Sequence, residues 1–215
     1  MIFHDRRDAG EQLTAALQAY RGRRPYVLAI PRGGVVVGYE VARGLEAPLD
    51  VVVPRKLRAP HNPELAVGAV AHDGSVYLDD PLVASLGVDE AYLRRETETQ
   101  LDEIRRRMVA YRGERPAPSL AGRAAIVVDD GLATGSTMIA GLRAVRGMSP
   151  EVLVAAIPVA PADTGARLRG EADEVISLHT PTLFYAVGQF YVNFDQVDDE
   201  EVVALLRRRE RELTE

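Results

Sequence analysis

An acidic pair followed by a loop of small residues is the part of this sequence with the clearest chemical potential. Asp129 and Asp130 end an apolar run, and residues 131–137 follow as Gly-Leu-Ala-Thr-Gly-Ser-Thr. Small residues expose successive backbone N–H groups, and such groups at the start of a helix form an anion site that suits a phosphate. The carboxylates would repel that phosphate and suit neighbouring hydroxyls or a Mg²⁺ ion instead. The pattern therefore predicts a ligand with a phosphate close to a diol, such as a ribose 5-phosphate.

The same segment resembles a known family. Residues 127–137, Val-Val-Asp-Asp-Gly-Leu-Ala-Thr-Gly-Ser-Thr, resemble the signature with which type I phosphoribosyltransferases bind 5-phosphoribosyl 1-pyrophosphate (PRPP). The resemblance extends over about residues 20–180. It implies that Asp129 and Asp130 bind the ribose hydroxyls and that the Thr-Gly-Ser-Thr turn binds the 5-phosphate. The substrate-binding residues that it implies in this loop are Gly131, Leu132, Ala133, Thr134, Gly135, Ser136 and Thr137.

A second motif, Pro31-Arg32-Gly33-Gly34, also follows a short apolar run, residues 25–30. Adjacent glycines let the backbone approach an anion closely, and Arg32 can add a bidentate charge. A turn without a ligand is the alternative interpretation. By the resemblance, this segment is the pyrophosphate loop of the family, which often contains a strained or cis peptide.

A basic pair, Arg55-Lys56, follows the next apolar run, residues 49–53, and Lys56 is the only lysine among the 26 basic residues. Lysine is a compact point charge and arginine a planar fork, so the two are not interchangeable where geometry is tight. The pair resembles the basic residues that adenine phosphoribosyltransferases place before their mobile loop. A merely surface-exposed pair is the alternative.

The stretch after this pair, residues 57–78 (the flap), contains prolines and glycines and only weak strand patterns at residues 65–71 and 75–78. We expect a long mobile loop with a small antiparallel portion, because long loops in compact domains are often functional lids. By the resemblance, the flap closes over PRPP and excludes water, which would otherwise hydrolyse a phosphoribosyl cation. Three of its residues can carry a proton, although a histidine in a mobile loop is more often only solvated: His61, Glu64 and His72.

Together these motifs imply an enzyme that displaces pyrophosphate from C1 of PRPP with a nitrogen of a base. Arg32, Lys56 and Mg²⁺ would neutralise the leaving group, while Asp129 and Asp130 would favour a cationic ribose and hold the metal. Arg55, Gly33 and Gly34 would contribute to substrate binding.

The acceptor is less defined by the sequence. Ala133 stands where enzymes for 6-oxopurines usually carry an aspartate. By the resemblance, this difference disfavours hypoxanthine and guanine as acceptors and favours the adenine type. Aromatic residues cluster in the C-terminal part of the chain, residues 180–215 (the hood), where they either stack on a flat base or anchor the last helix to the core. They are Phe184, Tyr185, Phe190, Tyr191 and Phe194.

Two other functions stay open. One is a PRPP-sensing regulator on the same fold without useful transferase activity, and the other is a different reaction on a related phosphosugar. A sensor needs a partner surface, but the arginine runs at 105–107 and 207–209 lie in glutamate-rich helices, which is typical of a solvated face.

Alternating strands and helices must position these motifs. Short apolar runs alternate with helical patterns, which predicts a doubly wound, mainly parallel α/β sheet flanked by helices, built as one domain over residues 1–215. The predicted strands are 25–30, 49–53, 124–128, 152–158 and 174–178, and the predicted helices are 8–20, 35–45, 89–111, 136–146, 163–170 and one from about 198. Glu103 and Arg107 are expected to form a surface pair.

Composition excludes several classes of protein. The 215 residues are 47% hydrophobic and 27% charged, which is enough to bury a core without cross-links. The absence of cysteine excludes disulfides and thiolate sites, and the net charge of −6 disfavours adhesion to nucleic acid or membrane. No apolar run has the length of a membrane span and the first residues do not form a signal peptide, so we expect a cytoplasmic protein. Relatives on this fold often dimerise, so a homodimer stays open.

Overall fold

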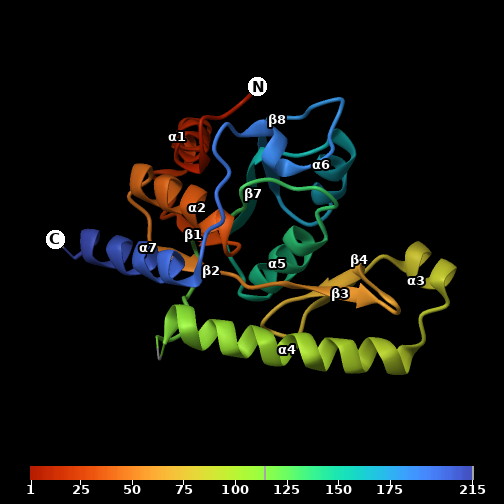
Figure 1. Cartoon of the computed structure of the whole chain (residues 1–215). Coiled ribbons are helices and arrows are strands. Elements are labelled where there is room, and N and C mark those ends of the chain that lie inside the picture. Colours follow the sequence, from red (N-terminus) through yellow and green to blue (C-terminus); the bar gives the residue numbers. More distant parts are fainter. Residues whose placement is uncertain (114, 215) are drawn as a thin grey trace.

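A five-stranded parallel sheet with the order β2-β1-β6-β7-β8 forms the centre of the protein (Figure 1). The computed structural model describes residues 1–113 and 115–214, without the side chain of residue 64, so the expectation placed on Glu64 lies outside the described residues. The strands are β1 (Tyr26–Ala29), β2 (Leu49–Val51), β6 (Ala124–Val128), β7 (Val152–Val159) and β8 (Glu174–His179). The chain order reverses between β1 and β6, and ligands of open α/β sheets bind at such a point, outside the carboxyl ends of the strands.

Helices cover both faces of this sheet because successive side chains of a strand point to opposite sides. In β6, Ile126 and Val128 pack into one apolar cluster and Ala125 and Val127 into another. The first cluster contains residues of α1 (Arg6–Ala16), α2 (Gly33–Gly44) and α7 (Asp199–Glu212), and the second contains residues of α5 (Ser136–Gly147) and α6 (Ala162–Leu168). The predicted doubly wound α/β fold is confirmed.

Local capping explains where two of the helices begin. Asp5 accepts hydrogen bonds from the backbone N–H groups of Arg7 and Asp8 and so starts α1. Gly135, in the left-handed conformation with φ of 76°, precedes α5. The predicted helix over residues 8–20 is displaced, because the α-helix ends at Ala16 and a short 3₁₀ turn, η1 (Gln18–Tyr20), follows.

The flap is more regular than the sequence indicated. Antiparallel strands β3 (Arg55–Ala59), β4 (Asn62–Val70) and β5 (Val76–Leu78) form a second, small sheet. The expectation of a loop directly after Lys56 was wrong, since β3 begins at Arg55 and turns at His61, whose φ is 62°. In β3 only Leu57 and Ala59 are buried, and two apolar residues are too few to give a readable alternation.

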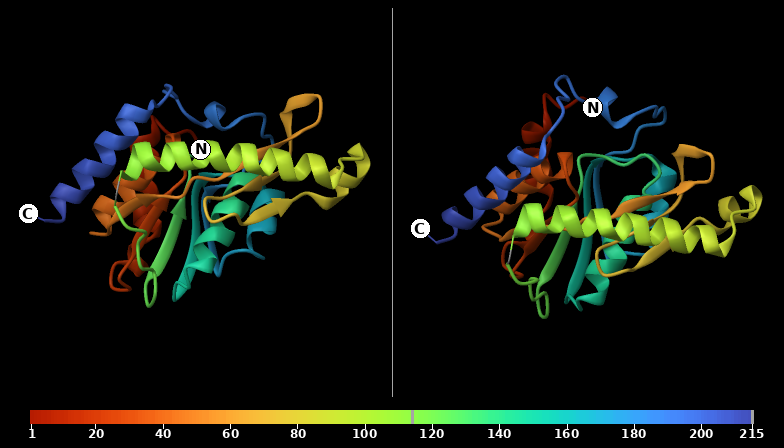
Figure 2. Two further views of the ribbon diagram at one scale, coloured as in Figure 1. Left: turned by 90° about the horizontal axis from the view of Figure 1, so that it is seen from below. Right: turned by 60° about the horizontal axis from the view of Figure 1, so that its bottom comes forward.

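A helix of 23 residues, α4 (Glu90–Arg112), runs beside the small sheet and extends to α7 (Figure 2). The prediction of residues 89–111 was correct to within one residue at each end. Its N-cap is Asp89, and its buried residues include Gln100, a polar residue that periodicity does not select. The short helix α3 (Asp80–Leu86) was not predicted; it has seven residues, none of them fully buried, which is too short for a helical period to be read from the sequence.

The arginine runs are largely solvated, and their most buried member lies on α7. On α4, Arg105, Arg106 and Arg107 pair with acidic residues of the same helix. On α7, however, Arg209 is only 5% exposed and its Nε donates a 2.9 Å hydrogen bond to the backbone carbonyl of Ala47. None of the described helices is long and apolar enough to cross a membrane.

Candidate active site

The three motifs from the sequence meet at the carboxyl ends of β1, β2 and β6. They line one cleft of about 430 Å³ (the basic cleft), which receives side chains from the core, the small sheet and α4. Its lining residues are Ile30, Pro31, Arg32, Gly33, Val53, Pro54, Arg55, Lys56, Arg58, Pro63, Arg107, Asp129, Asp130 and Thr137. The structure thus brings together Arg32, Lys56 and both aspartates, which are the residues expected to act on the substrate.

The acidic pair is tightly constrained. The Nε of Arg6 donates a 2.7 Å hydrogen bond to Oδ2 of Asp130, and the backbone N–H of Asp130 donates one of 2.9 Å to Oδ1 of Asp129. Burial raises the pKa of Asp129 well above its ordinary value, and the neighbouring charge of Asp130 raises it further. Burial also raises the pKa of Asp130, but the Arg6 guanidinium opposes this shift. Of the two carboxyl groups, Asp130 therefore has the environment that better supports a negative charge.

The glycines of the Pro-Arg-Gly-Gly motif allow the close approach of two loops. A Cβ atom at Gly33 would lie 1.9 Å from Oδ2 of Asp130, and one at Gly34 would lie 2.9 Å from the Cα of Asp129. A side chain at Gly34 would therefore push the two loops apart, and one at Gly33 would displace the Asp130 carboxylate and the Arg6 guanidinium. The peptide bond between Pro31 and Arg32 is cis.

The loop of residues 129–137 is supported by hydrogen bonds from α6, while the N–H groups of its second half, residues 133–137, remain available. Thr164 donates a 2.8 Å hydrogen bond through its hydroxyl to the carbonyl of Ala133, and Arg167 donates one of 3.0 Å to the carbonyl of Thr134. The hydroxyls of Thr134 and Ser136 lie 3.3 Å apart. Within the described part of the chain, the backbone N–H groups of residues 133–137 donate no hydrogen bond. They precede or begin α5, and free N–H groups at the start of a helix are the donors that an anion site uses.

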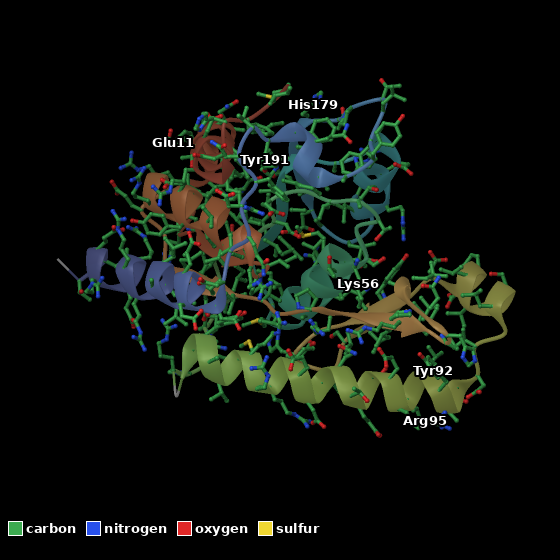
Figure 3. All side chains as sticks on the ribbon, viewed as in Figure 1. Glu11, Lys56, Tyr92, Arg95, His179 and Tyr191 are labelled. Carbon is green, nitrogen blue, oxygen red and sulfur yellow. The ribbon has the colours of Figure 1, made fainter. Side chains whose placement is uncertain are left out.

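The basic side chains of the cleft differ in how they are paired. Arg55 donates a 3.0 Å hydrogen bond to Oε1 of Gln100, and Arg32 lies 3.8 Å from Asp199. Lys56, which lies where the small sheet meets the core (Figure 3), is exposed and forms no ion pair with any described side chain. An unpaired ammonium at the mouth of a cleft is available to a ligand.

Two cations of this cleft were missed in the sequence. Arg58 lies two residues after Lys56 on β3, so both side chains lie on the same side of the strand. This relation could have been predicted if residues 55–59 had been identified as a strand. Arg107 forms the expected pair with Glu103, at 2.8 Å, but it also lines the cleft, with 19% of its side chain exposed. Nothing in its sequence context distinguishes it from its two arginine neighbours.

The hood aromatics divide between two roles. Phe190 and Tyr191 are buried with Phe3, which anchors the hood to the N-terminal segment, and the Tyr191 hydroxyl donates a 2.5 Å hydrogen bond to the carbonyl of Asp130. Phe194 packs against Arg6, at 3.8 Å from ring centre to guanidinium carbon.

Phe184 and Tyr185 line a second cavity of about 680 Å³ (the hood cavity), and the Phe184 ring also packs on Phe190, with 5.4 Å between the ring centres. Its other lining residues are Ala133, Pro161, Ala162, Asp163, Thr180, Pro181 and Thr182. Ala133 places this cavity against the same loop that carries the acidic pair.

The flap histidines do not reach the basic cleft. His61 is exposed at the turn between β3 and β4, and His72 is half-buried near Asp50 and Arg112. Neither lines the basic cleft or the hood cavity.

Comparison with known proteins assigns this chain to a family. A family model, the phosphoribosyl transferase domain, matches residues 7–195. This chain belongs to that family. The predicted resemblance and the type I phosphoribosyltransferase fold are therefore confirmed.

Individual relatives agree with this assignment. Two proteins from Mycobacterium tuberculosis, MT0597 of strain CDC 1551 / Oshkosh and Rv0571c of strain ATCC 25618 / H37Rv, are each 47% identical to all of this chain, and their names give phosphoribosyl transferase as a provisional assignment. The chain spans about half of their length, 48%. The crystal structure of TT1426 from Thermus thermophilus is 45% identical, with a TM-score of 0.82 over 97% of this chain and 99% of that one.

Proposed function

We propose that this phosphoribosyl transferase domain transfers the 5-phosphoribosyl group of PRPP to a nitrogenous base and releases pyrophosphate. The observation that carries the proposal is that two cavities of different character touch the same loop, residues 129–137. The basic cleft contains the acidic pair and five cationic side chains, whereas the described lining of the hood cavity contains no lysine or arginine. A displacement at C1 needs separate places for the leaving group and the acceptor, and two cavities at one ribose site supply them.

The ribose 5-phosphate part of PRPP fits the loop itself. The free N–H groups of residues 133–137 would bind the 5-phosphate, with the hydroxyls of Thr134, Ser136 and Thr137 as further donors. Asp129 and Asp130, directly before these donors, would bind the ribose hydroxyls. Because carboxylates also stabilise positive charge, they favour a transition state in which the ribose ring is cationic.

The pyrophosphate belongs in the basic cleft. Arg32, Lys56 and Arg58 would neutralise the charge that develops on it as the bond from C1 to oxygen breaks, and Arg55 and Gly33 would contribute to binding. The described residues contain no cluster of three or more metal ligands. The two carboxylates still fit Mg²⁺, which proteins often hold with one or two carboxylates plus substrate phosphates. When bound there by Asp129 and Asp130, the ion would supply further charge neutralisation of the pyrophosphate.

The acceptor belongs in the hood cavity. Phe184 and Tyr185 offer aromatic surface to a flat base, and the absence of lysine and arginine from the described lining favours an uncharged acceptor over an anionic one. The new bond forms between C1 and a ring nitrogen, and the proton on that nitrogen passes to water or to Asp163, the one acidic residue of the described lining. Since Ala133 offers no carboxylate to the base, the adenine type of acceptor fits better than a 6-oxopurine.

The test is the release of pyrophosphate from PRPP and Mg²⁺ by the purified chain, measured with a panel of purine and pyrimidine bases added one at a time. Release that depends on one base is expected, and that base is the acceptor. The Asp130→Asn variant serves as the matched control, with release lower by about 10²–10³-fold. PRPP binding without release for any base would replace the transferase with a PRPP sensor.

A further inference from the structure

Arg6 reaches the acidic pair from the other end of the chain. It is the first residue of α1, and its side chain is 11% exposed against 14% for its partner Asp130. Besides the 2.7 Å hydrogen bond from Nε to Oδ2 of Asp130, its Nη1 donates a 2.7 Å hydrogen bond to the backbone carbonyl of Asp195. The guanidinium packs on Phe194, with its carbon 3.8 Å from the ring centre. One planar side chain thus makes three contacts, one with the carboxylate and two with the hood.

The backbone around Arg6 fixes its position. Phe3 and Tyr191 form a parallel bridge, in which the N–H of Phe3 donates a 2.8 Å hydrogen bond to the carbonyl of Phe190 and the N–H of Val192 donates one of 2.9 Å to the carbonyl of Phe3. Asp5 then caps α1. Because the hood holds Phe3 and the helix cap holds Asp5, the backbone position of Arg6 is fixed.

The surroundings of Asp130 leave little freedom for its carboxylate. The backbone carbonyl of Asp130 accepts the hydrogen bond from Tyr191, and a Cβ atom at Gly33 would lie 1.9 Å from Oδ2 and 2.7 Å from Nε of Arg6. The hydrogen bond between Arg6 and Asp130 therefore sits directly against the backbone of the Arg-Gly-Gly loop. If Arg6 were lost, no other described side chain would hold Oδ2 on this side.

We propose that Arg6 is a positioning residue for the ribose site: it orients the Asp130 carboxylate towards the ribose hydroxyls and couples that carboxylate to hood residues 191–195. The inference rests on the proposed binding of PRPP. Arginine suits this role because its fork can bond Asp130 and Asp195 at once while its plane stacks on Phe194, and the compact ammonium of lysine cannot reproduce this planar geometry.

The first experiment measures binding of ribose 5-phosphate and of inorganic phosphate by calorimetry, without metal and without turnover. Arg6→Gln should weaken ribose 5-phosphate binding by about 10–100-fold, the usual effect of removing the partner that orients a binding group. Inorganic phosphate, which needs only the 133–137 donors, should bind as in the wild type. Arg7→Gln is the matched control, because Arg7 is the exposed neighbour on the same helix and its side chain donates no hydrogen bond to Asp130 or to the described part of the hood.

Two further variants separate positioning from charge and from folding. Arg6→Lys keeps the charge, so positioning predicts that it binds ribose 5-phosphate nearly as weakly as Arg6→Gln, and full rescue by lysine would overturn the proposal. Phe194→Leu leaves Arg6 in place but removes its stacking surface, so it should give a smaller loss of the same kind. It keeps the test decisive if the Arg6 variants fail to fold.

The outcomes distinguish this inference from the function on which it rests. If the wild-type chain binds neither ribose 5-phosphate nor PRPP, the proposed function is wrong. If the wild type binds ribose 5-phosphate and Arg6→Gln binds it equally well, the transferase proposal stands and the role of Arg6 is refuted.

Discussion

The basic cleft and the hood cavity share one loop but differ in almost every other respect. The basic cleft takes its side chains from β3, α4 and the Arg-Gly-Gly loop, and five of its lining residues carry positive charge. The hood cavity takes its side chains from Pro161 and the first turn of α6 and from the hood, and its described lining offers rings, hydroxyls and a single carboxylate. The same loop thus lines a cleft with five cationic side chains through Asp129, Asp130 and Thr137, and a cavity whose described lining has no lysine or arginine through Ala133.

The difference teaches which part of a displacement each region can support. A cationic cleft stabilises a group that gains negative charge, whereas a cavity without cations accepts a neutral, flat nucleophile without holding it as an anion. Substitutions in the two cavities should then change different kinetic constants.

The largest effect is expected in the basic cleft. Lys56→Ala removes a flap-side cation that forms no ion pair with the described side chains, and turnover should fall by about 10²–10³-fold. The measurement is the rate of pyrophosphate release at limiting and at saturating PRPP. Arg95→Ala, an exposed cation on α4 outside both cavities (Figure 3), is the control and should retain the wild-type rate. Equal rates for Lys56→Ala and the wild type would show that the positive charge of the basic cleft does not contribute to turnover.

A smaller and different effect is expected in the hood cavity. Tyr185→Ala should raise the KM for the acceptor base by roughly tenfold, because stacking of a base on an aromatic ring contributes about 1–3 kcal/mol. The affinity for PRPP should not change, and neither should stability, since Tyr185 is 85% exposed. Tyr185→Phe keeps the ring and should behave as the wild type. A change in PRPP affinity instead of acceptor KM would show that the two cavities are not separate in function.

The smallest effect is expected at His72. This residue lines neither cavity, so its substitution shows how much a change outside both cavities affects turnover and stability. Burial lowers the pKa of His72 in the folded protein, with Asp73, Arg112 and Asp50 as the charged groups that act on it. As the pH falls through about 6.5, the unfolded chain binds a proton that the folded chain binds less readily, so stability decreases. One group can contribute at most about 1.4 kcal/mol per pH unit. Urea unfolding between pH 8 and 5 should show a shallower pH dependence for His72→Gln, with turnover at pH 8 unchanged.

Much of the fold could be predicted from the sequence because the five core strands are short apolar runs between clear helical patterns. The acidic pair could also be predicted from the sequence, since its chemistry depends on consecutive residues directly after β6. The same holds for Arg32, whose loop has the same position after β1. In these cases the functional residues lie next to one another in the chain, and the sheet determines where they meet.

Contacts that join distant parts of the chain could not be predicted. Arg6 lies 124 positions from Asp130, and nothing near Arg6 marks it as a partner of a carboxylate. Arg107 was correctly paired with Glu103, but its place in the cleft depends on how α4 packs against β3. Phe184 and Phe190 look equivalent in the sequence, but Phe190, at the end of the turn η2 (Val187–Phe190), is buried, whereas Phe184 packs on it and lines the hood cavity.

The single lysine, Lys56, can report on the basic cleft beside the flap. Reagents specific for amines can modify only the ε-amine of Lys56 and the N-terminal amine of the described chain, and the latter lies 3.4 Å from Nε2 of His179 at the edge of the hood. Isotope-labelled methyl groups added to Lys56 would give one resolved NMR signal from the mouth of the basic cleft. The occupancy of the cleft would then be visible as a chemical-shift change in the intact protein, before any acceptor is known and without a single turnover.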